Sequence, residues 1–231
     1  MRVRKLLTTA GVITAAVILA LTPTAAHAAI ATIVVNGAAA PNADVNIDGV
    51  LTSASATYGG SPSGCGAGGT ITGKVKRGNG GLDPNPAFSM NTININCGSA
   101  IIPTILAIAI TCPIDVVMSN TNAVNVGTTD TNIQGVAKMT NGAGTDCVRV
   151  SFTGAGCRLD LRGSVAAKFD ETVTTVAGTD YQELSINGAG LTTQNATGLC
   201  AMLIPNNSAV TVSAAFLVHV SGTTTGVIDF Q

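Results

Sequence analysis

The segment AVTVSAAFLVHV, residues 209–220, alternates strongly apolar positions with smaller or more polar ones. Val210, Phe216 and Val218 fall on one face of an extended chain, whereas Thr211 and His219 fall on the other. This period of two is typical of a half-buried β-strand.

The same alternation recurs along the chain, and turn-forming residues separate its occurrences. Candidate strands lie at residues 71–75, 93–97, 148–152 and 159–161, and Gly- and Asn-rich turns at residues 78–81, 141–142, 154–156 and 187–188. No segment after residue 28 has a sustained helical period with caps. The pattern is typical of a sandwich or a barrel of antiparallel sheets. Of these we expect an all-β, antiparallel β-sandwich, Ig-like or jelly-roll-like, stapled by disulfides.

Residues 101–118 form the most apolar stretch outside the N-terminus, and a membrane helix is one interpretation of them. Pro103, Pro113 and Asp115 interrupt the run, which is rich in Ile and Val. We therefore expect two buried strands, at residues 104–111 and 114–119, with Cys112-Pro113 between them.

The composition excludes several classes of protein. The 231 residues are 46% hydrophobic and 10% charged, which argues against disorder and against a coiled coil. The formal net charge of −1 excludes a basic footprint for nucleic acid. Aromatic residues are scarce, so Val, Ile, Leu and Ala must supply most of the core.

Residues 1–28 have the features of a secretory signal peptide. Arg2, Arg4 and Lys5 precede an apolar run, and Ala26-His27-Ala28 has the small-x-small form that signal peptidase accepts. A retained membrane anchor is the alternative, but the run is short and a good cleavage site follows it. Cleavage leaves eight basic against twelve acidic residues, a formal charge of −4, and no stable membrane span. We expect a protein that is secreted or held in the cell envelope.

After the signal peptide we expect one domain of sheets. Residues 29–64 would supply an N-terminal strand and a Gly/Ser-rich region that belongs to the main domain, and residues 65–231 the disulfide-bonded sandwich. Residues 53–69 are rich in Ser and Gly, so a linker or a long loop is the expectation there.

An even number of cysteines behind an export signal predicts disulfides. The six are Cys65, Cys97, Cys112, Cys147, Cys157 and Cys200. Zinc is disfavoured because the chain has no C-x-x-C pair and keeps a single His after cleavage. We favour Cys157–Cys200, which closes a hairpin region and on the loop-entropy model contributes roughly 4 kcal/mol. Cys65–Cys97 would join two antiparallel strands, and Cys112–Cys147 is left by elimination.

The C-terminal third contains a series of short elements, namely Gly156-Cys157, Arg162-Gly163-Ser164-Val165, Leu184-Ser185-Ile186, Gly198-Leu199-Cys200 and the closing strand Ala209–Val220. In this layout it resembles a group of uncharacterised secreted proteins of actinobacteria, a bacterial group. The resemblance implies an exported, disulfide-bonded β protein of unknown function, and it assigns no catalytic or binding residue.

The sequence offers little for catalysis, so we expect no enzyme. His219 is the one candidate base of the mature chain, and its register places it on the outer face of a strand. No G-x-S-x-G elbow is present. A glycosidase needs only two carboxylates, but the acidic residues are scattered and Trp is absent from the sequence.

Asp44, Asn46 and Asp48 match the first half of a calcium loop, with Gly49 at the sharp turn. The closing Glu is missing, because Ser55 stands at the twelfth position. The competing interpretation is a strand in which Val45 and Ile47 face the core, and it is the one we favour. We expect no cofactor, and calcium at this segment is the one alternative left open.

Three functions remain open. The first is a non-enzymatic secreted or cell-surface protein with a structural or adhesive role, self-association included. The second is a binding module for a small apolar ligand held inside or between the sheets and lined by residues 101–118. The third is a membrane-active envelope protein, which liposome leakage would test. A filled core favours the first function, and a sizeable cavity beside residues 101–118 favours the second.

Overall fold

The computed structural model describes residues 32–58, 61–78, 86–99, 105–118, 132–152 and 156–231. The expected signal peptide, residues 1–28, lies outside the described residues. Nearly every element is a strand, which confirms the expected all-β class. The strands are β1 (Ile33–Val35), β2 (Ala43–Tyr58), β3 (Ser61–Cys65), β4 (Thr70–Arg77), β5 (Phe88–Ser99), β6 (Ile105–Ile110), β7 (Ile114–Met118), β8 (Ile133–Lys138), β9 (Val148–Phe152), β10 (Cys157–Val176), β11 (Thr179–Thr197), β12 (Ala209–Val220) and β13 (Ile228–Phe230), with one short helix α1 (Cys200–Leu203).

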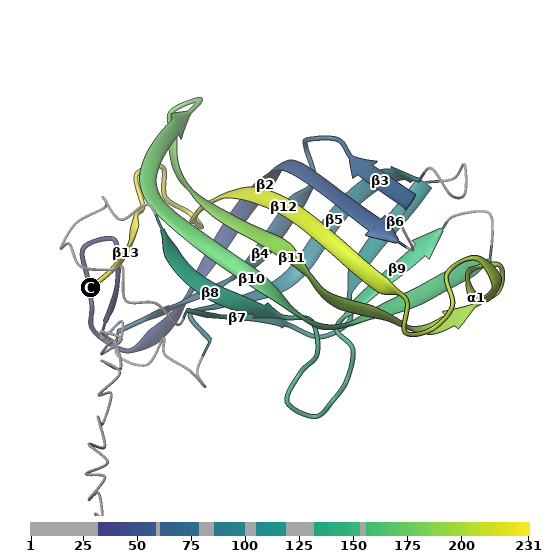
Figure 1. Ribbon diagram of the computed structural model, residues 1–231. Helices are drawn as coiled ribbons and strands as arrows, with labels where there is room; N and C mark the ends of the chain where they lie inside the picture. Colours follow the sequence, from purple (N-terminus) through teal and green to yellow (C-terminus); the bar gives the residue numbers. More distant parts are fainter. Residues whose placement is uncertain (1–31, 59–60, 79–85, 100–104, 119–131, 153–155) are drawn as a thin grey trace, which may run out of the picture.

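The large sheet closes on itself as an antiparallel barrel, so the expectation of a sandwich is wrong (Figure 1). Going round one end, the ring is β2–β3–β5–β6–β9–β10–β11–β12, and β12 pairs with β2 from Val210↔Tyr58 to Val220↔Ile47. Alternation along each strand is the same in a sandwich and in a barrel. Closure depends on the pairing of the first and last long strands, which alternation does not encode.

Three of the eight positions in the ring are filled by two short strands in succession. β3 and β4 both pair with β2, β6 and β7 both pair with β5, and β9 and β8 both pair with β10. The expected pair of strands within residues 101–118 is confirmed as β6 and β7. Residues 53–69 are not a linker or a long loop, because β2 and β3 occupy most of them.

A two-stranded sheet closes one end of the barrel. β1 and β13 pair from Ile33↔Phe230 to Val35↔Ile228, and Figure 1 shows β13 at the opposite end of the barrel from α1. Phe230 meets Phe88 and Phe169 with ring centroids 5.8 and 5.4 Å away. These rings fill this end of the interior.

Buried polar groups attach β13 to the barrel wall. The Gln182 side chain donates to the Ile228 carbonyl at 2.8 Å and accepts from the Ile228 N–H at 2.7 Å. The Phe230 N–H donates to the Glu171 carboxylate at 2.6 Å. Because β13 pairs only with the short β1, these bonds satisfy backbone groups that would otherwise be buried without partners.

The inward face of β12 is the one that alternation predicts. Val210, Phe216, Val218 and Val220 are buried, whereas Thr211 is exposed. All five Phe of the chain are in the core, so the few rings available are concentrated there.

Candidate functional site

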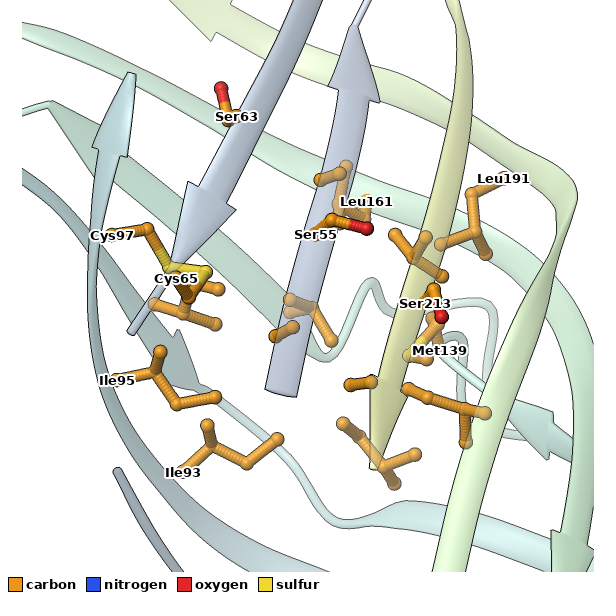
Figure 2. Close-up of a pocket in the computed structure, with 18 of the residues that line it drawn as sticks. Ser55, Ser63, Cys65, Ile93, Ile95, Cys97, Met139, Leu161, Leu191 and Ser213 are labelled. Atoms are coloured by element: carbon orange, nitrogen blue, oxygen red, sulfur yellow. A yellow bond between two sulfur atoms is a disulfide. The ribbon is translucent and has the colours of Figure 1, made fainter. Parts of the chain in front are cut away.

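An apolar cavity of about 80 Å³ lies inside the barrel. It lies beyond the aromatic end, in the part of the barrel that includes β3, β6 and β9. Figure 2 shows its lining side chains converging from strands all round the barrel. The described lining residues are Ala54, Ser55, Ala56, Tyr58, Ser63, Cys65, Ile93, Ile95, Cys97, Ile108, Ile114, Met139, Val148, Leu161, Ile186, Leu191, Val212, Ser213, Ala214 and Phe216.

The cavity exists because small side chains face each other across one pair of strands. Ala54 of β2 is directly opposite Ala214 of β12, and Ala56 is opposite Val212. Further along the same pair Phe216 faces Leu51, and both are buried. The inward side chains of this strand pair are therefore small beside the cavity and large where the aromatic end begins. Sequence reasoning missed this feature, although the alanines of Ser53-Ala54-Ser55-Ala56 and Ser213-Ala214-Ala215 are its signal.

Residues 101–118 contribute two side chains to the described lining. Ile108 of β6 and Ile114 of β7 both face the cavity. β6 and β7 pair with different parts of β5, so the two side chains reach the cavity from separate places on the wall.

Polar atoms are few in the lining. Among the described lining residues, only the three serines and Tyr58 carry a polar oxygen. Ser55 and Ser213 are exposed, whereas Tyr58 and Ser63 are buried, at 2% and 4% exposure. Burial raises the pKa of the Tyr58 hydroxyl, which therefore stays protonated. The Ser63 hydroxyl oxygen has no hydrogen-bond partner among the described residues.

The six cysteines form three disulfides, which confirms the expected number and the favoured pairs. They are Cys65–Cys97, Cys112–Cys147 and Cys157–Cys200. Cys65 and Cys97 line the cavity, and Figure 2 shows their bond in its wall. The other two disulfides lie outside the described lining. Cys112–Cys147 joins the break between β6 and β7 to the start of β9, and Cys157–Cys200 holds α1 against β10.

The three candidate calcium ligands lie in β2 and not in a loop, so the loop interpretation is corrected. Asp44 and Asn46 are exposed, Asp48 is half-buried, and Ile47 between them is buried in the core. Alternation therefore places the three polar side chains in a row along the outer face of a strand. Asp44 pairs with Lys76 at 3.4 Å and Lys74 at 3.8 Å. No group of three or more His, Cys, Asp or Glu in the described part of the chain could hold a metal ion.

His219 lies on the outer face of β12, where its register predicted it. Its ring packs edge-on against Tyr181, with centroids 5.0 Å apart, and its Nδ1 lies 3.2 Å from the Val220 carbonyl oxygen. Its strand partner on β2 is Asp48. His219 does not line the barrel cavity.

Two arginine–carboxylate pairs brace the barrel wall around β9 and β10. Arg162 donates to Asp146 at 2.8 and 3.0 Å, and Arg149 donates to Asp160 at 2.9 and 3.4 Å. Burial alone would raise the pKa of Asp160. Hydrogen bonds from Arg149 and Asn195, together with the arginine charge, outweigh this effect and hold the pKa below its ordinary value. None of these charged groups is among the described cavity lining.

Comparisons with known proteins add no relative: no family model, curated protein or solved structure matches this chain. Within the described ranges, no helix has the length and apolar character needed to cross a membrane. Three disulfides are typical of proteins that fold in an oxidising compartment.

Proposed function

We propose that this protein is a secreted, non-enzymatic binding module that encloses a small apolar molecule inside its barrel. The observation that carries the proposal is the cavity beside β6 and β7, lined almost wholly by aliphatic side chains. Eight-stranded barrels have an interior that side chains fill or that holds one small ligand. The aromatic end of this barrel is filled, whereas the part beyond it leaves a cavity of about 80 Å³.

The stability cost of an empty cavity also favours a binding role. A closed and empty apolar void of 80 Å³ would lower stability by about 2 kcal/mol at roughly 24 cal/mol per Å³. That is a large fraction of the ~5–15 kcal/mol by which domains are stable. Larger side chains at Ala54 or Ala214 would remove the void. A binding role accounts for the void, whereas the structural or adhesive role calls for a filled core.

Export to an oxidising compartment supports the same role. The three disulfides suit such a compartment. Disulfides in the wall and beside it hold the barrel around the cavity, so that little ordering is needed when a ligand enters.

Xenon under pressure tests the proposal, because it occupies apolar cavities without needing polar contacts. With methyl groups labelled for NMR, resonances of Ile108, Ile114 and Val148 should shift with xenon pressure. Those of Ile33 and Val75, which are buried but outside the described lining, should not.

A matched pair of variants identifies the site. Ala214→Leu fills the cavity and should abolish the shifts. Ala166→Leu adds the same bulk at an exposed position of β10 and should leave them unchanged. Absence of saturable shifts in the wild type, or an unchanged response in Ala214→Leu, contradicts the proposal.

A further inference from the structure

A second hollow, of about 300 Å³, lies on the outer face of the barrel wall, over β2 and its neighbours. The outward side chains in its described lining are those of Asp48, Val50, Thr70, Thr72, Tyr181 and His219. None of these residues belongs to the described lining of the cavity inside the barrel. The volume is at the lower end of the range for small-molecule sites, roughly 300–1,000 Å³.

The polar side chains of this hollow form one row across neighbouring strands, of which β11, β12 and β2 lie side by side in Figure 1. His219 of β12 is directly opposite Asp48 of β2, and Asp48 is directly opposite Thr72 of β4. The Tyr181 ring of β11 packs edge-on against the His219 ring, with centroids 5.0 Å apart. The chain neighbours of both Asp48 and His219 are buried, so alternation directs these two side chains outward.

Two polar groups at the centre of the row are available to a ligand. The Asp48 carboxylate is half-buried and has no hydrogen-bond or ion-pair partner in the described part of the chain. Asp44, the other carboxylate on the outer face of β2, already pairs with Lys74 and Lys76. In His219 the Nδ1 atom lies 3.2 Å from the carbonyl oxygen of the next residue, which leaves Nε2 for a ligand.

These groups together match the surface of a sugar ring. A carboxylate accepts hydrogen bonds from two neighbouring hydroxyl groups, and imidazole and threonine hydroxyls can donate or accept others. The face of an aromatic ring is negative, so the Tyr181 ring attracts the C–H groups on the flat side of a sugar. Val50, which is 37% exposed, adds an apolar contact.

A charged ligand fits the hollow less well than a neutral one. No Lys or Arg is in the described lining, so an anionic sugar would meet the Asp48 carboxylate without any counter-charge. A cation would gain one ion pair at the surface, which contributes little to binding. It would also leave the threonine hydroxyls of the hollow without a role.

We propose that this hollow is a surface site for a neutral saccharide. Asp48 and His219 bind the hydroxyl groups of one sugar ring, and Tyr181 packs against its C–H side. Thr70 and Thr72, both exposed, bind further hydroxyl groups along β4. This site goes beyond the proposed function, because it lies on the outside of the barrel and needs no ligand in the cavity. It would hold the protein at a polysaccharide surface.

An array of neutral, acidic and amine-bearing oligosaccharides tests the proposal, with the full chain as the probe. The neutral oligosaccharide that binds best is then titrated by NMR. The sequence has two His, so the ring signals of His219 are identified by their loss in His219→Gln. The ring signals of His219 and Tyr181 should shift saturably, whereas the methyl signals of Ile108 and Ile114 in the barrel cavity should not.

A matched pair of substitutions on one face of β2 locates the site. Asp48→Asn should lower the affinity for the oligosaccharide about tenfold, the usual effect of a hydrogen bond to a charged group. Asp44→Asn makes the same change outside this hollow and should leave the affinity unchanged. Tyr181→Ala should lower the affinity about threefold to tenfold. All three positions are on the outer face of the wall, so the variants should keep the wild-type melting temperature.

The outcomes are distinct from those of the xenon experiment. The saccharide site is overturned if no neutral oligosaccharide binds, or if only charged ones do. It is also overturned if Asp44→Asn and Asp48→Asn lose affinity equally, because the saccharide would then bind elsewhere. In each case the xenon response of the barrel cavity decides the proposed function by itself.

Discussion

Cys65 and Cys97 lie directly opposite each other on β3 and β5, with their Cα atoms 4.0 Å apart, and their disulfide is part of the cavity wall. The same bond thus connects neighbouring strands and shapes the site. Cys157–Cys200 closes a loop of similar length but lies outside the described lining. Variants that lack one or the other disulfide can therefore separate the effect of lost stability from the effect of a changed cavity wall.

Removing either disulfide should lower the free energy of unfolding by a similar amount. The loops span 32 and 43 residues, for which the loop-entropy model gives about 4 kcal/mol each. Cys65→Ala with Cys97→Ala, and Cys157→Ala with Cys200→Ala, are compared by urea unfolding. Only the first pair should also alter the xenon-induced methyl shifts, since only it removes atoms from the cavity wall. If the xenon-induced methyl shifts change equally in both double variants, the change is caused by lost stability and not by the loss of atoms from the cavity wall.

The sequence predicts much of this fold where the signal is local. Alternation in β12 correctly assigns its inward face, and Pro113 with Cys112 correctly divides the apolar run into β6 and β7. In both cases the information lies within neighbouring residues. The expected pair Cys65–Cys97 is also correct, but the reason given for it is not, because the two cysteines lie on β3 and β5 and β4 separates these strands in the chain.

The features that sequence reasoning missed depend on contacts between distant segments. Closure requires β12 to pair with β2, and the sealed end requires β13 to pair with β1. The cavity requires a further condition, that Ala54 and Ala214 meet in one register. A shift of that pairing would put a different side chain opposite Ala54, so neither alanine alone predicts a void.

Phe230 should be among the most sensitive positions for stability, although it is the second residue from the C-terminal end of the chain. Its ring contacts Phe88 and Phe169, and its N–H bonds to buried Glu171. Phe230→Ala should lower the free energy of unfolding by about 3–5 kcal/mol, as for other buried rings. Gln231→Ala, at the half-buried adjacent position, is the control and should cost far less. Equal losses in the two variants, measured by urea unfolding, would show that β13 does not seal the core.

Calcium at millimolar concentration should leave the melting temperature unchanged. Asp44, Asn46 and Asp48 are spread along a strand, and Asp44 already has two lysine partners. Calcium prefers six to eight oxygens around one point, which a single strand face does not supply. Thermal unfolding with calcium, and with magnesium as the control, is the measurement. A rise specific to calcium that disappears in Asp48→Asn would restore the metal-site hypothesis.

Protonation of Asp160 should lower the free energy of unfolding in acid. Its pKa in the folded state lies below the unfolded value of about 4, so the ionised form stabilises the fold above that pH. The contribution is fully present near neutral pH and is lost as the pH falls through the folded-state pKa. Urea unfolding at a series of pH values should therefore show the wild type's advantage over Asp160→Asn shrinking below about pH 4. In an Arg149→Ala background, which removes the main hydrogen bond to the carboxylate, the same substitution should show a much weaker pH dependence. A pH dependence that is identical with and without Arg149 would rule out this ion pair as its cause.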